Sequence, residues 1–278
     1  MTPQIHIYVL ASGSKGNAAV IAGPQGSLLV DCGISRKQLL LRADEVGCDL
    51  SRVSAILVTH EHGDHTSGLS VVCKHFDGPI FATAGTVAGK QHLSSLPFTL
   101  IDHDDTLELC GMRVRAFPTS HDVNDPMCFR FEVCATDLLG ESEVLDAVGW
   151  VSDTGYLTDK ALDALYGCRI LCIEANHDKH MLQNGPYPAY LKARVAGESG
   201  HLSNDQAAKA LPTLVTSDTE TVVALHLSQE NNRPSIAVRT LGDAVNARPV
   251  EGKVAEARTK DGLLSICAAG QDRPMFVW

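Results

Sequence analysis

One stretch of the sequence decides the fold, and it runs Val53-Ser54-Ala55-Ile56-Leu57-Val58-Thr59-His60-Glu61-His62-Gly63-Asp64-His65. Its first half is short, apolar and rich in β-branched residues, and polar residues and a glycine close it. This pattern predicts a buried β-strand that ends just before the first histidine. Side chains two positions apart point the same way in extended backbone, so we expect His60 and His62 to lie side by side.

The polar end of this stretch is typical of a metal site. Gly63 lets the chain turn, and a helix is predicted from residue 66 to residue 76, so Asp64 and His65 can approach from the other side. A chance polar loop is the alternative, but three histidines and an aspartate at this spacing favour metal ligation. Four ligands within six residues can hardly converge on one ion, and they suit two neighbouring ions better.

Length and composition bound the architecture. The 278 residues, 44% of them hydrophobic, can bury one large core or two small ones, and we predict a single domain over residues 1–278. No apolar run approaches the ~20 residues that a membrane helix needs. The apolar run at residues 5–11 has no Lys or Arg before it, which favours a first β-strand over a signal peptide. We therefore expect a cytoplasmic protein without membrane contact.

Cysteine usage and charge narrow the class further. The nine cysteines are scattered and form no C-x-x-C pair, so they are predicted to be reduced core residues rather than disulfides or a cysteine zinc site. The formal net charge of −10 argues against a broad basic surface for nucleic acid. A phosphate substrate remains compatible with it, because bound dications invert the local field of a site.

Strands and helices are predicted along the whole chain. Strands are expected at residues 5–11, 18–22, 27–30, 53–58, 79–83, 127–135, 148–151, 170–173 and 221–225. Helices are expected at residues 35–46, 66–76, 84–93, 158–166, 205–214 and 235–245. The acidic stretch at residues 137–146 is predicted to be a solvated hairpin excursion. Two strand-rich halves with helices outside predict an α/β fold with two mixed sheets sandwiched between helices.

Three more candidate ligands follow apolar strands. His121 comes after Val114-Arg115-Ala116-Phe117-Pro118, Asp153 after Val148-Gly149-Trp150-Val151, and His226 after Val222-Val223-Ala224-Leu225. Each strand would deliver one donor at its exit. An aspartate suits the middle position, because a carboxylate can bridge two cations and an imidazole cannot. Alone, each of these residues would be an ordinary polar group at a strand end.

With these residues the sequence resembles the metallo-β-lactamase fold superfamily, whose pattern is H-x-H-x-D-H followed by a His, an Asp and a last His. Further motifs resemble the YycJ/WalJ (VicX) branch of it: Ser12-Gly13-Ser14-Lys15-Gly16-Asn17, Asp31-Cys32-Gly33, Ser152-Asp153-Thr154-Gly155-Tyr156, Glu174-Ala175-Asn176-His177-Asp178, Gly200-His201-Leu202-Ser203-Asn204 and His226-Leu227-Ser228-Gln229-Glu230-Asn231-Asn232. The residues after about position 245 carry no motif that we can place.

The resemblance implies an αββα sandwich and hydrolysis at a dinuclear centre. By position, His60, His62 and His121 would hold one metal and Asp64, His65 and His226 the other, with Asp153 bridging them. Histidine-rich ligation favours Zn²⁺, while the two aspartates keep Mn²⁺ possible. Members of this branch are described as metal-dependent nucleases acting on DNA. We therefore expect a DNA exonuclease that uses a hydroxide bridging the two metals as nucleophile.

Other residues have expected roles near this centre. Asp64, besides ligating, is expected to orient the hydroxide, and the resemblance gives His201 the role of general acid or phosphate contact. The alternative for His201 is a histidine at a helix start, with Ser203 or Asn204 as the cap. His177, beside Glu174, is expected either to orient such a group or to lie on the surface.

Substrate contacts are predicted at several small or basic residues. Amides and hydroxyls of the first loop, with Ser12, Ser14 and Lys15, could meet a phosphate; the alternative is an ordinary Gly/Ser turn. Lys192 and Arg194 follow an aromatic segment and could track a nucleic-acid backbone, with the alternative of a solvated surface. Two further candidate contacts are Asn204 and Arg233.

Other functions remain open from the sequence. A small-molecule or RNA phosphodiesterase of the same superfamily would use the same metals. A thioester or lactam hydrolase has no obvious use for His201 or for the basic segment. A non-catalytic, metal-binding regulatory protein is the alternative from another class, and the complete ligand set argues against it. No obligate protein partner is evident.

Overall fold

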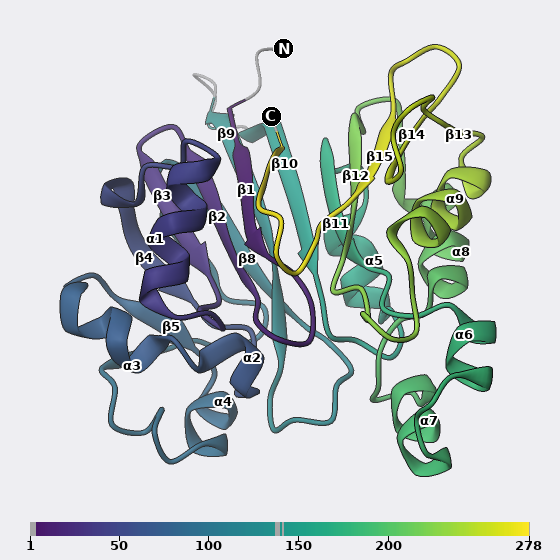
Figure 1. Ribbon diagram of the computed structural model, residues 1–278. Coiled ribbons are helices and arrows are strands. Elements are labelled where there is room, and N and C mark those ends of the chain that lie inside the picture. The colour runs from purple at the N-terminus through teal and green to yellow at the C-terminus, as the bar shows by residue number, and fades with distance from the viewer. Residues whose placement is uncertain (1–3, 137–139, 141, 278) are drawn as a thin grey trace. The chain divides into compact units, whose positions relative to one another are not determined.

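The computed structural model describes residues 4–136, 140 and 142–277, and it contains two mixed β-sheets with flanking helices (Figure 1). The predicted α/β class is therefore confirmed. The chain divides into two compact units, of which unit 1 comprises Met1–Pro118, Val123–Ala147 and Gln271–Trp278. Unit 2 comprises Thr119–Asp122 and Val148–Gly270. A single domain over residues 1–278 stays a prediction.

Unit 1 is built on a seven-stranded mixed sheet with the order β16-β1-β2-β3-β4-β5-β6. The strands are β1 (His6–Ala11), β2 (Ala18–Gly23), β3 (Gly26–Val30), β4 (Val53–Leu57), β5 (Ile80–Ala82), β6 (Phe98–Leu100) and β16 (Met275–Val277). β16, β1, β2 and β3 pair antiparallel, whereas β3 to β6 pair parallel. The four predicted strands between residues 5 and 58 are thus confirmed.

The strands β2, β3 and β5 are buried at nearly every residue, which explains why they are continuously apolar rather than alternating. All five residues of β3 are buried, for example. Helix α1 (Arg36–Glu45) covers one face through Leu39 and Ala43 and belongs to the same core as Cys32 and Cys48. Burial raises the pKa of these two thiols to about 12 and about 11, so both stay protonated, as expected of core cysteines.

The helix predicted from residue 66 to residue 76 is wrong in its extent. The chain forms two short helices, α2 (Gly63–Thr66) and α3 (Leu69–Val72), and a 3₁₀ turn at Cys73–His75. The break lies at Gly68, whose amide donates to the carbonyl of Cys32 at 2.8 Å. A Cβ at Gly68 would come within 2.1 Å of the Ile34 carbonyl oxygen, so the chain approaches the 32–34 segment too closely for any other residue.

Antiparallel strands complete unit 1. β7 (Thr106–Leu109), β8 (Met112–Pro118) and β9 (Met127–Thr136) pair in sequence order, and the short helix α4 (Ala84–Gly89) precedes them. The acidic hairpin excursion predicted at residues 137–146 falls partly on residues 137–139 and 141, which lie outside the described residues. Its last part is wrong, because β10 (Ser142–Val151) already begins at Ser142.

Unit 2 contains a parallel set of strands. The end of β10, β11 (Ile170–Glu174), β12 (Thr221–Leu225) and β15 (Ser265–Ala268) pair parallel in that order. β14 (Glu256–Arg258) and β13 (Arg248–Pro249) add antiparallel strands beside β15. Parallel strands end at the same edge of a sheet, so residues that follow β10, β11 and β12 are brought close together.

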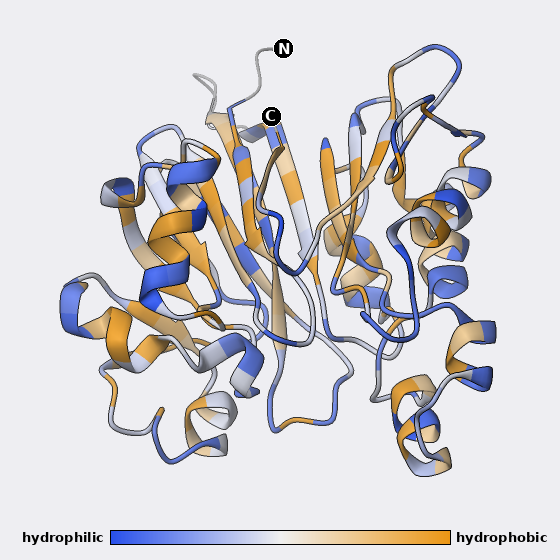
Figure 2. Ribbon diagram, viewed as in Figure 1, coloured by the Kyte–Doolittle hydropathy of each residue, from blue (hydrophilic) through white to orange (hydrophobic). Residues whose placement is uncertain are grey.

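The helices of unit 2 are α5 (Asp159–Leu165), α6 (Lys179–Asn184), α7 (Ala189–Ala196), α8 (Asn204–Leu214) and α9 (Pro234–Ala244). α8 begins with a complete capping box formed by Ser203 and Gln206. α8 and α9 lie together beside the strands (Figure 1), and the apolar residues gather on the strands and on the helix faces turned toward them (Figure 2). α5, α8 and α9 confirm three predicted helices, whereas α6 and α7 were not predicted.

None of the helices in the described parts of the chain has the length and apolar character that crossing a bilayer requires.

Candidate functional site

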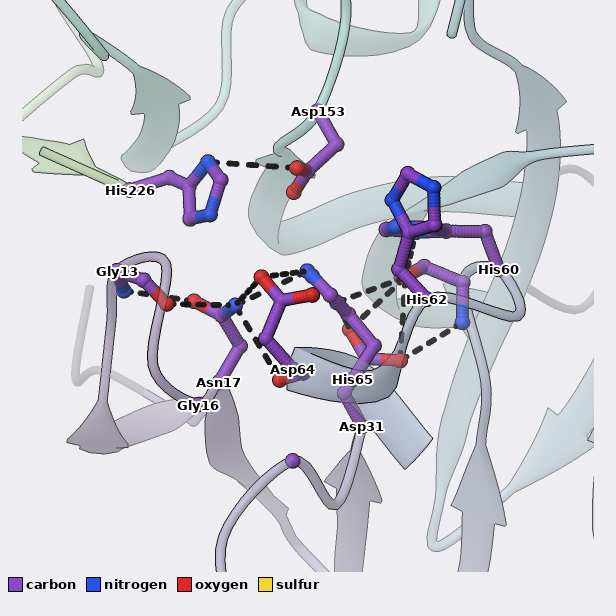
Figure 3. A network of polar contacts seen from close by, with 12 residues as sticks. Gly13, Gly16, Asn17, Asp31, His60, His62, Asp64, His65, Asp153 and His226 are labelled. Carbon is purple, nitrogen blue, oxygen red and sulfur yellow. Dashed lines mark hydrogen bonds and ion pairs between the residues drawn. The ribbon is translucent and has the colours of Figure 1, made fainter. Parts of the chain in front are cut away.

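In unit 1 the predicted ligands lie together after β4. His60 and His65 are buried, with ring centroids 4.0 Å apart, and the rings of His60 and His62 are 4.9 Å apart (Figure 3). The expected side-by-side placement of His60 and His62 agrees with this geometry. Asp64 and His65 lie on α2, where an Asp64 carboxylate oxygen is 3.6 Å from His65 Nε2.

A buried carboxylate orients two of these histidines. Asp31, at the end of β3, lies 2.7 Å from His65 Nδ1 and accepts hydrogen bonds from the amide and the hydroxyl of Thr59. Since a carboxylate only accepts, Nδ1 of His65 carries the proton and its lone pair is on Nε2. The Thr59 hydroxyl donates to Asp31 and can therefore accept from His60 Nδ1, 3.0 Å away, which orients His60 in the same way.

Asn17 connects the first loop to α2. Its backbone amide donates to the Asp64 carbonyl at 2.7 Å, and its side-chain amide lies 2.9 Å from His65 Nε2 (Figure 3). On the other side, its carbonyl accepts from the Gly33 amide at 2.8 Å. The loop therefore fixes the backbone of Asp64 and borders the space in front of His65.

In unit 2 the predicted donors lie at strand exits. Asp153 follows β10, Glu174 ends β11 and His226 follows β12. Together with His201, each of these residues offers one donor atom, and the four atoms all lie within 4.8 Å of one another. Asp153 Oδ1 is 3.3 Å from His226 Nδ1 (Figure 3) and 3.9 Å from Nε2 of His121. The proximity of Asp153 and His226 agrees with the prediction of one donor per strand.

The strand exits share an unusual backbone conformation. Asp31, Asp153 and His226 have φ values of 58°, 55° and 53°, in the left-handed region that residues other than glycine rarely adopt. All three are buried. Such strain persists where the surrounding structure fixes the residue, and it is concentrated at functional sites.

Glu174 is the organising carboxylate of unit 2. It is fully buried and accepts from the amides of Thr154 and Leu202, while its other oxygen lies 2.8 Å from His201 Nδ1 and 3.1 Å from His226 Nδ1. Burial acts to raise its pKa, but the charge of His201 and the hydrogen bonds from both histidines lower the pKa below its usual value. Glu174 is thus an ionised carboxylate that orients two imidazoles.

Four of the five predicted ligand histidines, all except His62, are oriented in the same way. Nδ1 of His121 lies 3.0 Å from the carbonyl oxygen of Gly200, which can only accept. Nδ1 is therefore bound by a protein oxygen in His60, His65, His121 and His226 alike, and each ring has its lone pair on Nε2. Oxygen partners on Nδ1 are the usual companions of metal-binding histidines. The donor sets of both units therefore fit divalent cations such as Zn²⁺ or Mn²⁺.

His201 and His177 differ in their surroundings. The side chain of His201 is 19% exposed, compared with 1% for His121 and 3% for His226, so His201 is the accessible imidazole of this set. Ser203 is the N-cap of α8, as the alternative for His201 expects, and His201 lies two residues before it. His177 is buried, which contradicts its alternative placement on the surface, and burial lowers its pKa to about 4.

The predicted contact at Asn204 is wrong. Asn204 is 1% exposed, and its side-chain amide exchanges two hydrogen bonds of 3.0 and 2.8 Å with the buried amide of Asn232. This pair joins the start of α8 to the loop after β12, and burial keeps the Asn204 amide away from a substrate. Ser12 is buried as well, whereas Ser14 and Lys15 are exposed.

The predicted basic contacts lie on the surface and have partners in unit 2. Lys192 donates to the carbonyl of Gln183, and the guanidinium of Arg194 pairs with Asp122. The guanidinium of Arg233 donates to the backbone carbonyls of Gln229 and Asn232. Arg194 remains about half exposed, so a phosphate can compete with Asp122 for it.

Sequence reasoning did not assign roles to Asn17, Asp31 and Thr59. All three belong to motifs visible in the sequence: Asn17 closes the first loop, Asp31 opens Asp31-Cys32-Gly33, and Thr59 precedes His60. Their partners lie up to 48 residues away in the chain, so the contacts could not be read from local spacing.

Comparison with known proteins shows which family the chain resembles. A family model described as a β-lactamase superfamily domain matches residues 27–227. An exodeoxyribonuclease YycJ of Bacillus anthracis is 33% identical over 84% of this chain and 86% of the relative. An exodeoxyribonuclease WalJ of Streptococcus pneumoniae serotype 2 is 31% identical over 84% of this chain and 85% of the relative.

A solved structure supports the same fold. The metallo-β-lactamase fold protein YhfI of Bacillus subtilis matches 99% of this chain and 100% of its own length, with a TM-score of 0.68 and 14% identity. This likeness confirms the αββα fold that the motifs predict. The chain thus belongs to the β-lactamase superfamily, whose members are metal-dependent hydrolases, and within it to the family of the YycJ and WalJ proteins.

Proposed function

We propose that this protein is a dinuclear metal-dependent phosphodiesterase, and specifically a DNA exonuclease of the cytoplasm. The observation that carries the proposal is its similarity, over most of their length, to relatives named exodeoxyribonucleases. The orientation of the predicted ligand histidines supports it. Nδ1 of His65, His121 and His226 faces a protein oxygen, which leaves the lone pair of each ring on Nε2, where it can bind a metal.

The proposed ligand sets follow the family pattern found in the sequence. His60, His62 and His121 would hold one cation, Asp64, His65 and His226 the other, and Asp153 both. We propose Zn²⁺ or Mn²⁺, since imidazole nitrogens suit the first and added carboxylates the second. When bound, such cations lower the pKa of a water and neutralise the negative charge that grows on a phosphoryl group.

The protein's own groups would move the protons. Asp64, whose side chain is 23% exposed, would accept a hydrogen bond from the attacking water and orient it. His201, held at Nδ1 by Glu174, would carry a proton on Nε2 and donate it to the leaving 3′ or 5′ oxygen as the P–O bond breaks. The contact with Glu174 would fix the orientation of the His201 ring for this step.

Substrate binding would be local rather than spread over the surface. The exposed or partly exposed predicted contacts are Ser14, Lys15, Lys192, Arg194 and Arg233, and the chain as a whole carries a net charge of −10. Affinity for DNA should therefore fall with added salt, but less steeply than for a broadly basic binder. If hydrolysis persisted with no salt dependence, a small phosphodiester would be the better substrate.

The decisive experiment supplies the metal-free full chain with Zn²⁺ or Mn²⁺ and end-labelled single- and double-stranded DNA. Stepwise shortening from one end, abolished by a chelator and by Asp64→Ala, is expected. Asp272→Asn, on an exposed side chain, is the control variant and should keep full activity.

Parallel substrates separate the alternatives. RNA and cyclic or bis-aryl phosphodiesters are tested under the same conditions, and faster turnover of either would replace DNA as the substrate class. Binding of two metals without hydrolysis of any phosphodiester would instead indicate a regulatory protein.

A further inference from the structure

The C-terminal segment, for which the sequence offered no role, contacts the first loop of unit 1. Gln271 is 8% exposed, and its side chain holds this loop at two adjacent points. Oε1 accepts from the Lys15 amide at 2.7 Å, and Nε2 donates to the Gly16 carbonyl at 2.8 Å. Both polar atoms of the Gln271 side chain are therefore used on the loop backbone.

The loop has little room to move on its other side. Gly16 has a φ of +154°, and a Cβ there would come within 2.5 Å of the Ile34 side chain and 2.8 Å of the Gly33 carbonyl oxygen. The residue after Gly16 is Asn17, whose amide donates to the Asp64 carbonyl. Gln271 thus binds the loop at Lys15 and Gly16, within two residues of Asn17, whose hydrogen bond fixes the backbone of the predicted ligand Asp64.

Gln271 is itself firmly anchored. The Arg42 guanidinium on α1 donates to the carbonyls of Gln271, at 2.6 Å, and Leu10, at 3.2 Å. It also pairs with the Asp272 carboxylate at 2.9 Å. Three residues further on, β16 pairs antiparallel with β1. Gln271, which holds the loop by two hydrogen bonds, is therefore itself fixed to the sheet and to α1.

We propose that Gln271 is a positioning residue for Asp64 and His65, which it holds through the Lys15–Asn17 backbone. The proposal rests on the proposed function only in that these two side chains are taken as metal ligands. The C-terminal segment would then hold the loop, and with it the Asn17 side-chain amide 2.9 Å from His65 Nε2, in one position beside the two predicted ligands. Gln271 touches neither substrate nor metal.

The test compares Gln271→Met with wild type in metal-free full-length protein. Methionine keeps the length and nearly the volume of glutamine but can neither donate nor accept these hydrogen bonds. Calorimetric titration with Zn²⁺ and with Mn²⁺ is expected to show one of two dissociation constants raised about tenfold, at the lower end of the effect of residues that orient ligands. Gln271→Glu keeps the acceptor for the Lys15 amide, and its dissociation constant should lie between those of wild type and Gln271→Met.

A second readout follows the loop directly. Amide hydrogen exchange in the peptide that covers residues 12–17 should be faster in Gln271→Met than in wild type, with other peptides unchanged. Asp272→Asn, which removes only an exposed partner of Arg42, should change neither the dissociation constants nor the exchange.

The outcomes separate this inference from the proposed function. Wild-type dissociation constants for both metals in Gln271→Met would overturn the positioning role, and so would an equal loss at both sites together with a general rise in exchange. The assay of the proposed nuclease activity uses no Gln271 variant, so its failure would leave the metal-binding result of Gln271→Met fully interpretable.

Discussion

Oε1 of Glu174 lies 2.8 Å from Nδ1 of His201, and both side chains belong to unit 2. The same oxygen lies 3.1 Å from Nδ1 of His226. One carboxylate therefore orients the proposed proton donor and a proposed metal ligand at once. Substitutions at the three positions should affect catalysis and metal binding in different proportions.

His201→Ala should keep both metals and lose about 10²–10⁴-fold in kcat, because only the proton donor is removed. Glu174→Gln should show a comparable loss of kcat and, in addition, about 10–100-fold weaker binding of one metal, because His226 loses its partner. Turnover and metal content by mass spectrometry check both. Glu198→Gln, on an exposed side chain of the same unit, is the control. Loss of metal in His201→Ala would make His201 a ligand instead.

Asp31→Asn should weaken the binding of one metal about 10–100-fold. Asparagine turns an N–H toward His65 Nδ1, so the ring proton moves to Nε2 and blocks the lone pair that ligation requires. Metal titration and the ¹⁵N shifts of His65 measure the two effects. Asp125→Asn is a matched control, since Asp125 lies 2.6 Å from His103, which is no predicted ligand. Unchanged affinity in Asp31→Asn would contradict the proposed role of His65.

Much of this candidate site was visible in the sequence because strand exits carry the predicted ligands. His60, Asp153 and His226 each follow an apolar run, and a donor at the end of a buried strand is a local signal. Strands β1 to β5 and β9 to β12 and most helices were predicted for the same reason, since periodicity and capping residues are local too, whereas β13 to β16 were not predicted. The helix after His65 was predicted too long because the break at Gly68 depends on a contact with the 32–34 segment.

The remaining errors have the same origin. Asn204 carries an amide that suits a phosphate, and nothing near it in the sequence shows that Asn232 takes both of its polar atoms. Gln271 lies 256 residues from Lys15, so its clamp on the loop could not be predicted from spacing. Local patterns reveal which residues can do chemistry, whereas long-range hydrogen bonds decide which of them are committed to the structure.

His177 should make the stability of the protein depend on pH. Burial lowers its pKa to about 4, below the ordinary value of 6.5, so the folded state holds it neutral. The stability that this group contributes is complete above pH 6.5 and is lost as the pH falls. At pH 4 the loss amounts to about 3 kcal/mol. Urea unfolding of metal-free protein at pH 7, 5.5 and 4 should show a smaller loss in His177→Gln than in wild type. His180→Gln, on an exposed side chain, should follow wild type.

Asn204→Ala should destabilise the fold by about 1–3 kcal/mol, because Asn232 keeps a buried amide with fewer partners. The KM for DNA should not change, since Asn204 is buried. Thermal unfolding and steady-state kinetics test the two statements, with the exposed Asn184→Ala as control. A raised KM with an unchanged melting temperature would restore Asn204 as a substrate contact. Adding Asn232→Ala should destabilise the fold further, because Asn232 also donates to the buried carbonyls of Ala175 and Asn176.

Arg194→Ala should raise the KM for single-stranded DNA and leave kcat unchanged. The guanidinium is 52% exposed and its partner Asp122 is 31% exposed, so this ion pair is worth little and can be exchanged for a phosphate contact. Loss of one such contact lowers the slope of log affinity against log salt by about 0.7 for a single strand. Arg248→Ala is the matched control, because Arg248 is 75% exposed and pairs with Asp243 in the same unit. If both variants shifted the salt slope equally, the DNA would be held by diffuse charge rather than by a defined contact at Arg194.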